Sequence, residues 1–188
     1  MKKVYLIHGY GGEPNGGWRP WLMGKLAREE VWACAPAMPM SNNPKKDEWV
    51  AEITRQVGKS SKDIFLVGHS LGVPALLHYL QSLPKEESIG GVLLVSGPVH
   101  ILPAIRYRPI HHFMDTDFNF EHIKQVCKNF SVIHGEDDST VPFSHAIELS
   151  EKLNCKLVSI KGGGHLNGSS GCYELPEALE ALNKMMNQ

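Results

Sequence analysis

Residues 63–83 constrain the fold more than any other part of the chain. Residues 64–67 are apolar and rich in β-forming side chains, and the next five residues read Gly-His-Ser-Leu-Gly. Apolar residues at helical spacing then follow at Leu71, Ala75, Leu76, Tyr79, Leu80 and Leu83. This order of strand, G-x-S-x-G turn and helix predicts a nucleophile elbow, a sharp turn that holds Ser70 in a strained conformation above the end of a sheet. Gly68 and Gly72 are expected to be glycines because a Cβ at either position would collide with a neighbouring strand or helix.

The rest of the chain alternates between apolar runs of strand length and helical patterns. Strands are predicted at residues 3–7, 31–35, 64–67, 91–96, 130–133 and 156–160. Helices are predicted at residues 18–27, 47–57, 71–83, 120–126, 143–153 and 174–186. The alternation predicts one α/β domain over residues 1–188, with a six-stranded, mostly parallel sheet and helices on both faces. The loops that follow the strands then lie along one edge of the sheet, where such sheets bind ligands.

The charge balance and the cysteines argue against several classes of protein. Nineteen basic and twenty acidic residues give a net charge of −1, which removes any broad electrostatic case for binding nucleic acid or an anionic membrane. No apolar run approaches transmembrane length, and the apolar stretch after residues 1–3 is too short for a signal core, so we expect a cytoplasmic protein. The four cysteines contain no C-x-x-C pair, so we expect free thiols and no metal site.

Three loops that follow predicted strands carry the residue types of a catalytic triad. A serine hydroxyl is a weak nucleophile until a base removes its proton, and that base is usually a histidine oriented by a carboxylate. Ser70, Asp138 and His165 occur in the order serine, acid, histidine that α/β-hydrolases share. Asp137 competes for the role of the acid. Asp138 is favoured because the Asp-x-x-Val-Pro spacing that begins there occurs in many α/β-hydrolases.

His165 is selected from ten histidines. It follows three glycines after the last predicted strand, whereas His78 lies two helical turns beyond Ser70, too far from the strand ends. His8 and His134 precede glycines at strand ends and are interpreted as turn residues. Five further histidines are interpreted as surface residues: His100, His111, His112, His122 and His145.

Backbone N–H groups near the serine are expected to form an oxyanion hole. One donor is the N–H of Leu71, and the other is the N–H of Tyr10 in the glycine-rich turn of residues 8–12, with Gly11 as the alternative. Pro14 stands where a dinucleotide fingerprint would place its third glycine, so no nucleotide cofactor is expected. The candidates for a substrate pocket are Tyr10, Gly11, Trp18, Trp21, His69 and the stretch 98–118. Ordinary packing is the alternative for Tyr10, the two tryptophans and the stretch 98–118.

Five blocks of the sequence resemble a known family. They are His8 to Gly12, Trp18 to Trp21, Gly68 to Gly72, Asp138 to Phe143 and Gly163 to His165. Over nearly its whole length the chain is similar to the small serine hydrolases grouped with bacterial YdeN-like proteins and retinoblastoma-binding protein nine. The resemblance implies a minimal α/β-hydrolase fold of six strands without a cap domain, with Ser70, Asp138 and His165 as the triad. It also implies hydrolysis of carboxylic esters or small amides. The Leu-x-Cys-x-Glu segment of the vertebrate member is absent, because residues 153–157 end in leucine.

The leading hypothesis is therefore a serine esterase that acts on small esters through an acyl-enzyme. The alternatives are an amidase or aminopeptidase with the same triad, and a partner-binding protein with a vestigial site. The insertion between Ser96 and Phe120 has only about twenty residues, too few for a packed cap domain. We therefore expect a preference for short acyl chains and no activation at a lipid interface.

Overall fold

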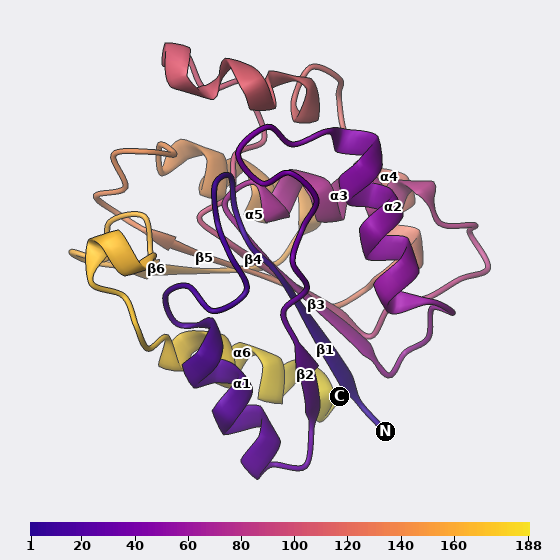
Figure 1. The fold of residues 1–188 in the computed structure, drawn as a ribbon. Helices are drawn as coiled ribbons and strands as arrows, with labels where there is room; N and C mark the ends of the chain where they lie inside the picture. Colours follow the sequence, from indigo (N-terminus) through magenta and orange to yellow (C-terminus); the bar gives the residue numbers. More distant parts are fainter.

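Six strands form one parallel sheet in the computed structural model, which describes residues 1–188 (Figure 1). The strands are β1 (Lys3–Ile7), β2 (Trp32–Cys34), β3 (Ile64–His69), β4 (Gly91–Val95), β5 (Phe130–Gly135) and β6 (Lys156–Ile160). Their order is β2-β1-β3-β4-β5-β6, and every neighbouring pair is parallel. The chain therefore reverses its winding direction at β1, and the loops after β1 and β3 meet at a topological switch point. The predicted α/β fold with a six-stranded sheet is confirmed.

Helices cover both faces of the sheet, as predicted (Figure 1). On one face lie α1 (Arg19–Arg28) and α6 (Pro176–Met186). On the other face lie α2 (Lys46–Val57), α3 (Gly72–Ser82), α4 (Phe120–Val126) and α5 (Ser144–Leu153). Successive strand residues point to opposite faces, so Val4 and Leu6 join a core cluster of 16 buried residues under α1 and α6. Tyr5 and Ile7 join the larger cluster of 32 buried residues on the opposite face.

Three element boundaries differ by two residues from the sequence-based expectation, for identifiable reasons. Strand β5 continues past Ile133 through Gly135, because His134 and Gly135 still pair with β6. Strand β3 continues past Val67 through His69, because Gly68 pairs with both β1 and β4 and His69 still pairs with β4. Helix α6 begins at Pro176 rather than at Glu174, because a proline fits the first turn of a helix, where its missing N–H is not needed.

The insertion between β4 and α4 forms a short 3₁₀ helix, Ile105–Phe113, which stands above the helical layer in pink tones in Figure 1. Ile110 and Phe113 anchor it in the larger core cluster, while Ile101 and Ile105 are exposed. The segment is a strap over the helices and has no core of its own.

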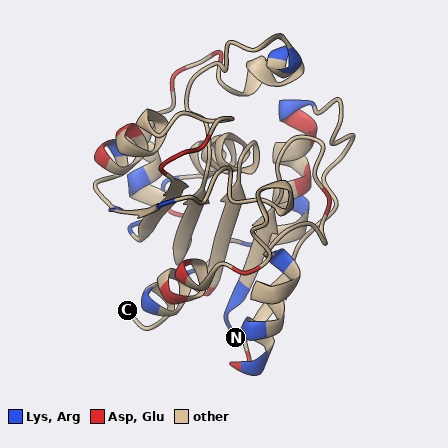
Figure 2. Ribbon diagram, turned by 90° about the vertical axis from the view of Figure 1, so that its left-hand side faces the viewer, with Lys and Arg blue, Asp and Glu red and all other residues tan.

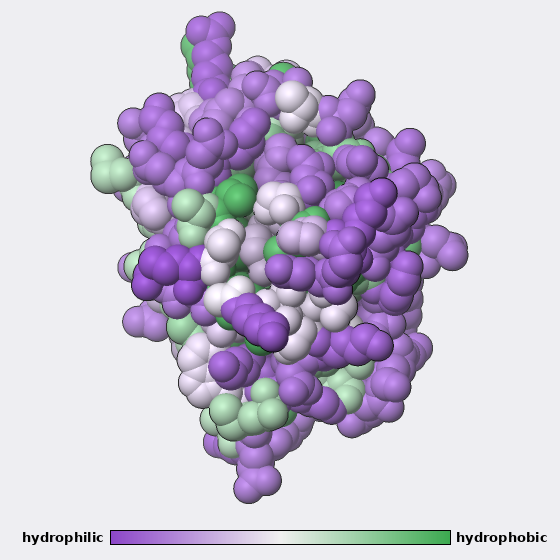
Figure 3. Space-filling model, turned by 90° about the vertical axis from the view of Figure 1, so that its right-hand side faces the viewer, coloured by the Kyte–Doolittle hydropathy of each residue, from purple (hydrophilic) through white to green (hydrophobic).

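Charged residues of both signs lie mainly on the outer faces of the helices (Figure 2). On the face shown in Figure 3, apolar residues form small separate patches among hydrophilic ones. No helix has both the length and the apolar character needed to cross a membrane.

Candidate active site

Ser70 occupies a strained turn between β3 and α3. Its φ angle is 54°, in the left-handed region that non-glycine residues rarely adopt. A Cβ on Gly68 would lie 2.8 Å from the carbonyl oxygen of Gly72, and a Cβ on Gly72 would lie 2.3 Å from that of Ile7. Both separations are below van der Waals contact, so only glycine fits at either position and the turn stays tight. The expected steric role of the two glycines is confirmed.

His165 contacts both the serine and the acid. Its Nε2 lies 3.0 Å from Oγ of Ser70, and its Nδ1 lies 2.8 Å from Oδ2 of Asp138. A carboxylate only accepts hydrogen bonds, so Nδ1 carries the proton and Nε2 is free to accept from the serine hydroxyl. The three residues come from the loops after β3, β5 and β6, and parallel strands bring those loops to one edge of the sheet.

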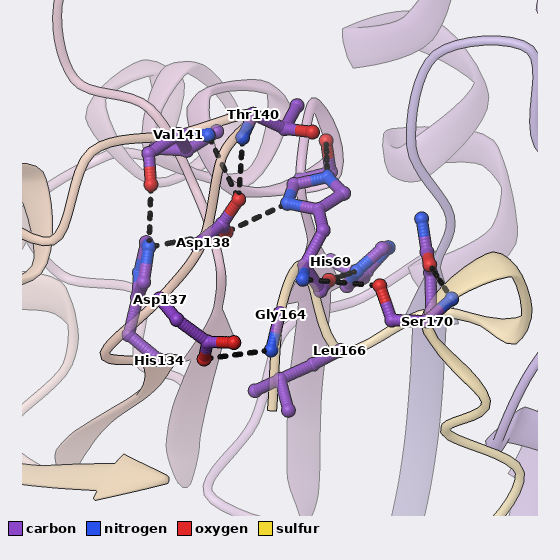
Figure 4. Close-up of polar contacts among 12 residues, drawn as sticks. His69, His134, Asp137, Asp138, Thr140, Val141, Gly164, Leu166 and Ser170 are labelled. Atoms are coloured by element: carbon purple, nitrogen blue, oxygen red, sulfur yellow. Dashed lines mark hydrogen bonds and ion pairs between the residues drawn. The ribbon is translucent and has the colours of Figure 1, made fainter. Parts of the chain in front are cut away.

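Asp138 is held by four nitrogen atoms (Figure 4). Its Oδ1 accepts from the backbone N–H groups of Thr140 at 2.8 Å and Val141 at 3.0 Å. Its Oδ2 accepts from His165 and lies 3.3 Å from Nε2 of His134. Burial alone would raise the pKa of this carboxyl, but hydrogen bonds from His134 and His165 outweigh burial and hold the pKa below its ordinary value. Asp138 is therefore ionised at neutral pH and fixed in direction.

Asp137 has a different role from its neighbour. Its Oδ1 accepts from the backbone N–H of Gly164 at 3.0 Å, so it holds the loop that carries His165 (Figure 4). That loop passes close to β5, because a Cβ on Gly135 would lie 2.1 Å from the carbonyl oxygen of Gly164. Only glycine therefore fits at position 135, while Gly162 and Gly164 have positive φ angles of 67° and 53° that favour glycine in the turn itself.

His134 is a supporting residue that the sequence did not reveal. It was expected in a turn, but it lies inside β5 and is fully buried. Its Nε2 donates to the carbonyl oxygen of Val141 at 2.9 Å, which closes the loop around Asp138. The only signal in the sequence was its position next to Gly135 at the end of a strand.

His69 lies beside His165, with the two ring centroids 5.1 Å apart. Its Nε2 donates to the carbonyl oxygen of His165 at 3.0 Å, which fixes the backbone there. Burial lowers the pKa of His69 to about 3, and the nearby His165 and Arg19 add to the shift. The imidazole is therefore neutral at physiological pH and adds no charge to the site.

The glycine-rich turn after β1 faces the serine. A Cβ on Gly9 would lie 2.8 Å from Cβ of Ser70, so the two loops are in direct contact. The backbone N–H of Gly11 donates to the carbonyl oxygen of Ser41 at 2.8 Å, whereas the N–H groups of Tyr10 and Leu71 have no acceptor within the chain. Tyr10 and Leu71 therefore keep free donors, and Gly11, the alternative, does not.

A cavity of about 500 Å³ opens at this point. Ser70, His69 and His165 line it, together with the turn from Gly9 to Gly12. Of the predicted pocket residues, Tyr10, Gly11 and His69 are therefore at the cavity. Its other lining residues are Glu13, Asn15, Gly16, Gly17, Arg19, Asn167, Gly168, Ser169 and Tyr173.

The two tryptophans and the insertion lie elsewhere. Trp18 is buried in the core under α1, and its indole N–H donates to the carbonyl oxygen of Leu166 at 2.8 Å. Trp21 packs against the same core cluster, and no residue of 98–118 lines the cavity. Trp18 and Trp21 therefore pack α1 on the sheet, which is the alternative to a pocket role.

Nearly the whole chain matches a known family. Residues 4–184 match the sequence model of the family described as serine hydrolase. The chain belongs to the serine hydrolase family. It is 31% identical over 187 residues to YdeN of Bacillus subtilis (strain 168), covering 100% of this chain and 97% of that protein. It is 23% identical over 187 residues to the serine hydrolase RBBP9 of Rattus norvegicus, covering 98% and 95% of the two chains.

Solved structures agree with this family membership. The crystal structure of the ydeN gene product from B. subtilis superposes on this serine hydrolase with a TM-score of 0.95, covering 100% of both chains. Est1E from Butyrivibrio proteoclasticus, at 16% identity, has a TM-score of 0.76 and covers 100% of this chain and 89% of its own. At that identity, the second likeness shows the fold alone.

Proposed function

We propose that the protein hydrolyses small carboxylic esters through a Ser-His-Asp triad and an acyl-enzyme. The single observation that supports this most directly is His165, which lies within hydrogen-bond distance of Ser70 on one side and of Asp138 on the other. The unpaired N–H groups of Tyr10 and Leu71 beside the serine supply the second requirement, donors for a developing oxyanion.

In the proposed first step, Oγ of Ser70 attacks the ester carbonyl carbon and its proton moves to Nε2 of His165. The carbonyl oxygen becomes negatively charged and accepts hydrogen bonds from the N–H groups of Tyr10 and Leu71. The tetrahedral intermediate collapses, the C–O bond to the alcohol breaks, and His165 returns the proton to the departing alcohol. Asp138 remains ionised and stabilises the imidazolium throughout.

In the second step, water replaces the alcohol. His165 takes a proton from the water as it attacks the acyl carbon, and the same two N–H groups stabilise the second tetrahedral intermediate. The bond to Oγ of Ser70 then breaks, the proton returns to the serine, and the carboxylic acid leaves. No further group is needed to balance either step.

The cavity favours small, polar substrates. Only two of its 16 lining residues are hydrophobic, and none comes from the insertion between β4 and α4. A lipase-like lid would have to reach across the site, and the segment Ile105–Phe113 packs on the helical layer instead. For nitrophenyl esters of increasing chain length, we expect kcat/KM to be highest for short acyl groups, with no rise in rate when the substrate forms micelles.

Covalent labelling tests the proposal most directly. A fluorophosphonate probe should label the wild-type protein at Ser70 and should fail to label Ser70→Ala, which should also lose ester hydrolysis while keeping its circular dichroism spectrum. Absence of labelling in the folded wild type would indicate the alternative of a vestigial, partner-binding site. Labelling combined with faster cleavage of aminoacyl amides than of matched esters would favour the amidase alternative. The cytoplasmic location stays a prediction that fractionation would check.

A further inference from the structure

A buried arginine lines the same cavity as the serine. Arg19 is the first residue of α1, and its side chain reaches the cavity that contains Ser70 and His165. Only 6% of the residue is exposed. Arginine is almost never buried to this extent unless its charge is paired, because removal of a charge from water is unfavourable.

The guanidinium of Arg19 has fewer partners than it can hold. Its Nε donates to the carbonyl oxygen of Pro14 at 3.3 Å, and its Nη2 donates to that of Glu13 at 2.7 Å. A guanidinium carries five N–H donors, so three remain without an acceptor in the chain. Nη1 has no hydrogen-bond partner in the chain, and it is accessible to solvent.

No carboxylate of the protein forms an ion pair with this charge, although Glu13, which lines the same cavity, lies near enough to raise the Arg19 pKa against the effect of burial. Arg19 takes part in none of the ion pairs of the chain, and the nearby Glu13 is exposed. Burial lowers the pKa of Arg19 to about 10, so the side chain remains charged at neutral pH. The positive end of the α1 dipole lies at the same residue and favours an anion further.

The surroundings favour one carboxylate over a phosphate group. Apart from Arg19, the lining contains no arginine or lysine, and the neighbouring His69 is neutral. A single guanidinium matches one carboxylate through two parallel N–H···O bonds, whereas doubly charged phosphate groups are usually held by several donors.

We propose that Arg19 binds a carboxylate of the substrate, so that the enzyme prefers esters that carry a second, acidic group. This inference rests on the proposed esterase function and names its substrate class. A role in holding the loop at Glu13 and Pro14 accounts for two of the five donors only. The three remaining donors lie beside the cavity, where a substrate carboxylate can accept hydrogen bonds from them.

The test compares anionic esters with neutral esters of nearly the same shape. One pair is the 4-nitrophenyl monoester of adipic acid and its methyl ester, which places the charge on the acyl side. The other pair is the butyrate ester of 3-hydroxybenzoate and that of its methyl ester, which places the charge on the alcohol side. The quantity measured is the ratio of kcat/KM for the anionic ester to that for the neutral ester.

For the wild type we expect this ratio to exceed one in at least one pair. In Arg19→Met the ratio should fall by roughly 10- to 100-fold, the size associated with a charge-assisted hydrogen bond. Arg19→Lys keeps the charge but not the planar fork, so its ratio should lie between those two. The matched control is Arg28→Met, on the exposed last turn of the same helix, which should leave the ratio unchanged.

Inhibition gives an independent readout that needs no turnover of the anionic esters. Adipate should inhibit hydrolysis of the neutral ester competitively, and its inhibition constant should rise in Arg19→Met but not in Arg28→Met. A wild-type ratio near or below one in both pairs would overturn the inference. So would an unchanged ratio in a folded Arg19→Lys or Arg19→Met, since a loop-holding residue would slow both esters equally. Labelling of Ser70 and hydrolysis of the neutral esters by the wild type report on the esterase function separately.

Discussion

The two walls of the cavity differ in how completely their polar groups are paired. The acid wall is formed by residues 134–141 and 163–166, of which His165 reaches the cavity. Both oxygens of Asp138 and both ring nitrogens of His165 have partners within the chain, and the buried side-chain atom without a partner there is Nδ1 of His134. In the glycine wall, formed by residues 9–19, the N–H of Tyr10 and three donors of Arg19 have none.

This difference separates polar groups that are held in place by hydrogen bonds from polar groups that are free to bind a ligand. Polar groups that are paired within the chain keep one geometry, whereas the unpaired donors of Tyr10 and Arg19 lie at the open cavity, where a ligand can reach them. The free groups named in the glycine wall are donors, whereas Asp137 and Asp138 in the acid wall accept hydrogen bonds from within the chain. The acid wall therefore holds ionisable groups in fixed positions, and the glycine wall holds free N–H donors that can bind an anion.

The largest effect is expected in the acid wall, from the two neighbouring aspartates. Asp138→Asn should lower kcat by about 10³- to 10⁴-fold, because an amide can donate to His165 and favour the wrong tautomer. Asp137→Asn should lower it far less, because its amide oxygen can still accept from Gly164. Steady-state kinetics of the two variants, with melting temperatures as the control, checks this. Equal losses would mean that the two carboxylates do not divide their roles as the contacts indicate.

The next largest effect is expected in the glycine wall. Tyr10→Pro removes one free N–H, so kcat should fall by about 10²- to 10³-fold, the usual effect of one oxyanion donor. Tyr10→Phe keeps the N–H and is the matched control, with a much smaller loss expected. If a folded Tyr10→Pro variant retains the rate of Tyr10→Phe, the second donor lies elsewhere.

The smallest effect concerns stability and pH. Burial lowers the pKa values of His8, His69 and His78, that of His69 to about 3. An unfolded histidine titrates near 6.5, so below that pH the unfolded chain binds more protons than the folded chain and stability falls as pH falls. His69 alone should contribute about 2 kcal/mol to this loss between pH 6.5 and 5.

Urea unfolding at pH 7 and pH 5 measures this loss. His69→Gln removes one buried imidazole, so its free energy of unfolding should change less with pH than that of the wild type. His111→Gln, at a half-buried position where the ring donates only to the carbonyl oxygen of Leu102, is the control and should keep the wild-type dependence. An identical pH dependence in His69→Gln and the wild type would show that His69 is not held neutral.

The fold could be predicted almost completely because its signals are local. Apolar runs, helical spacing and chain-breaking glycines and prolines gave six strands and six helices close to their observed positions. Errors fell at element ends, as at Pro176 and His69, where pairing and proline geometry decide the boundary. The roles of the two tryptophans were harder to predict, because apolar spacing alone does not distinguish a helix face that packs on the core from one that lines a pocket. Trp18 and Trp21 pack on the core.

The sequence by itself determined the strained serine, the order of the three candidate catalytic residues and the edge of the sheet where they meet, because sterics and strand direction follow from local pattern. Only the tertiary structure decided that Asp138 rather than Asp137 contacts His165, that His134 and His69 support the site, and that Arg19 faces the cavity. Those contacts join loops that are distant in the chain. Their partners depend on where each loop folds back, which no periodicity in the sequence records.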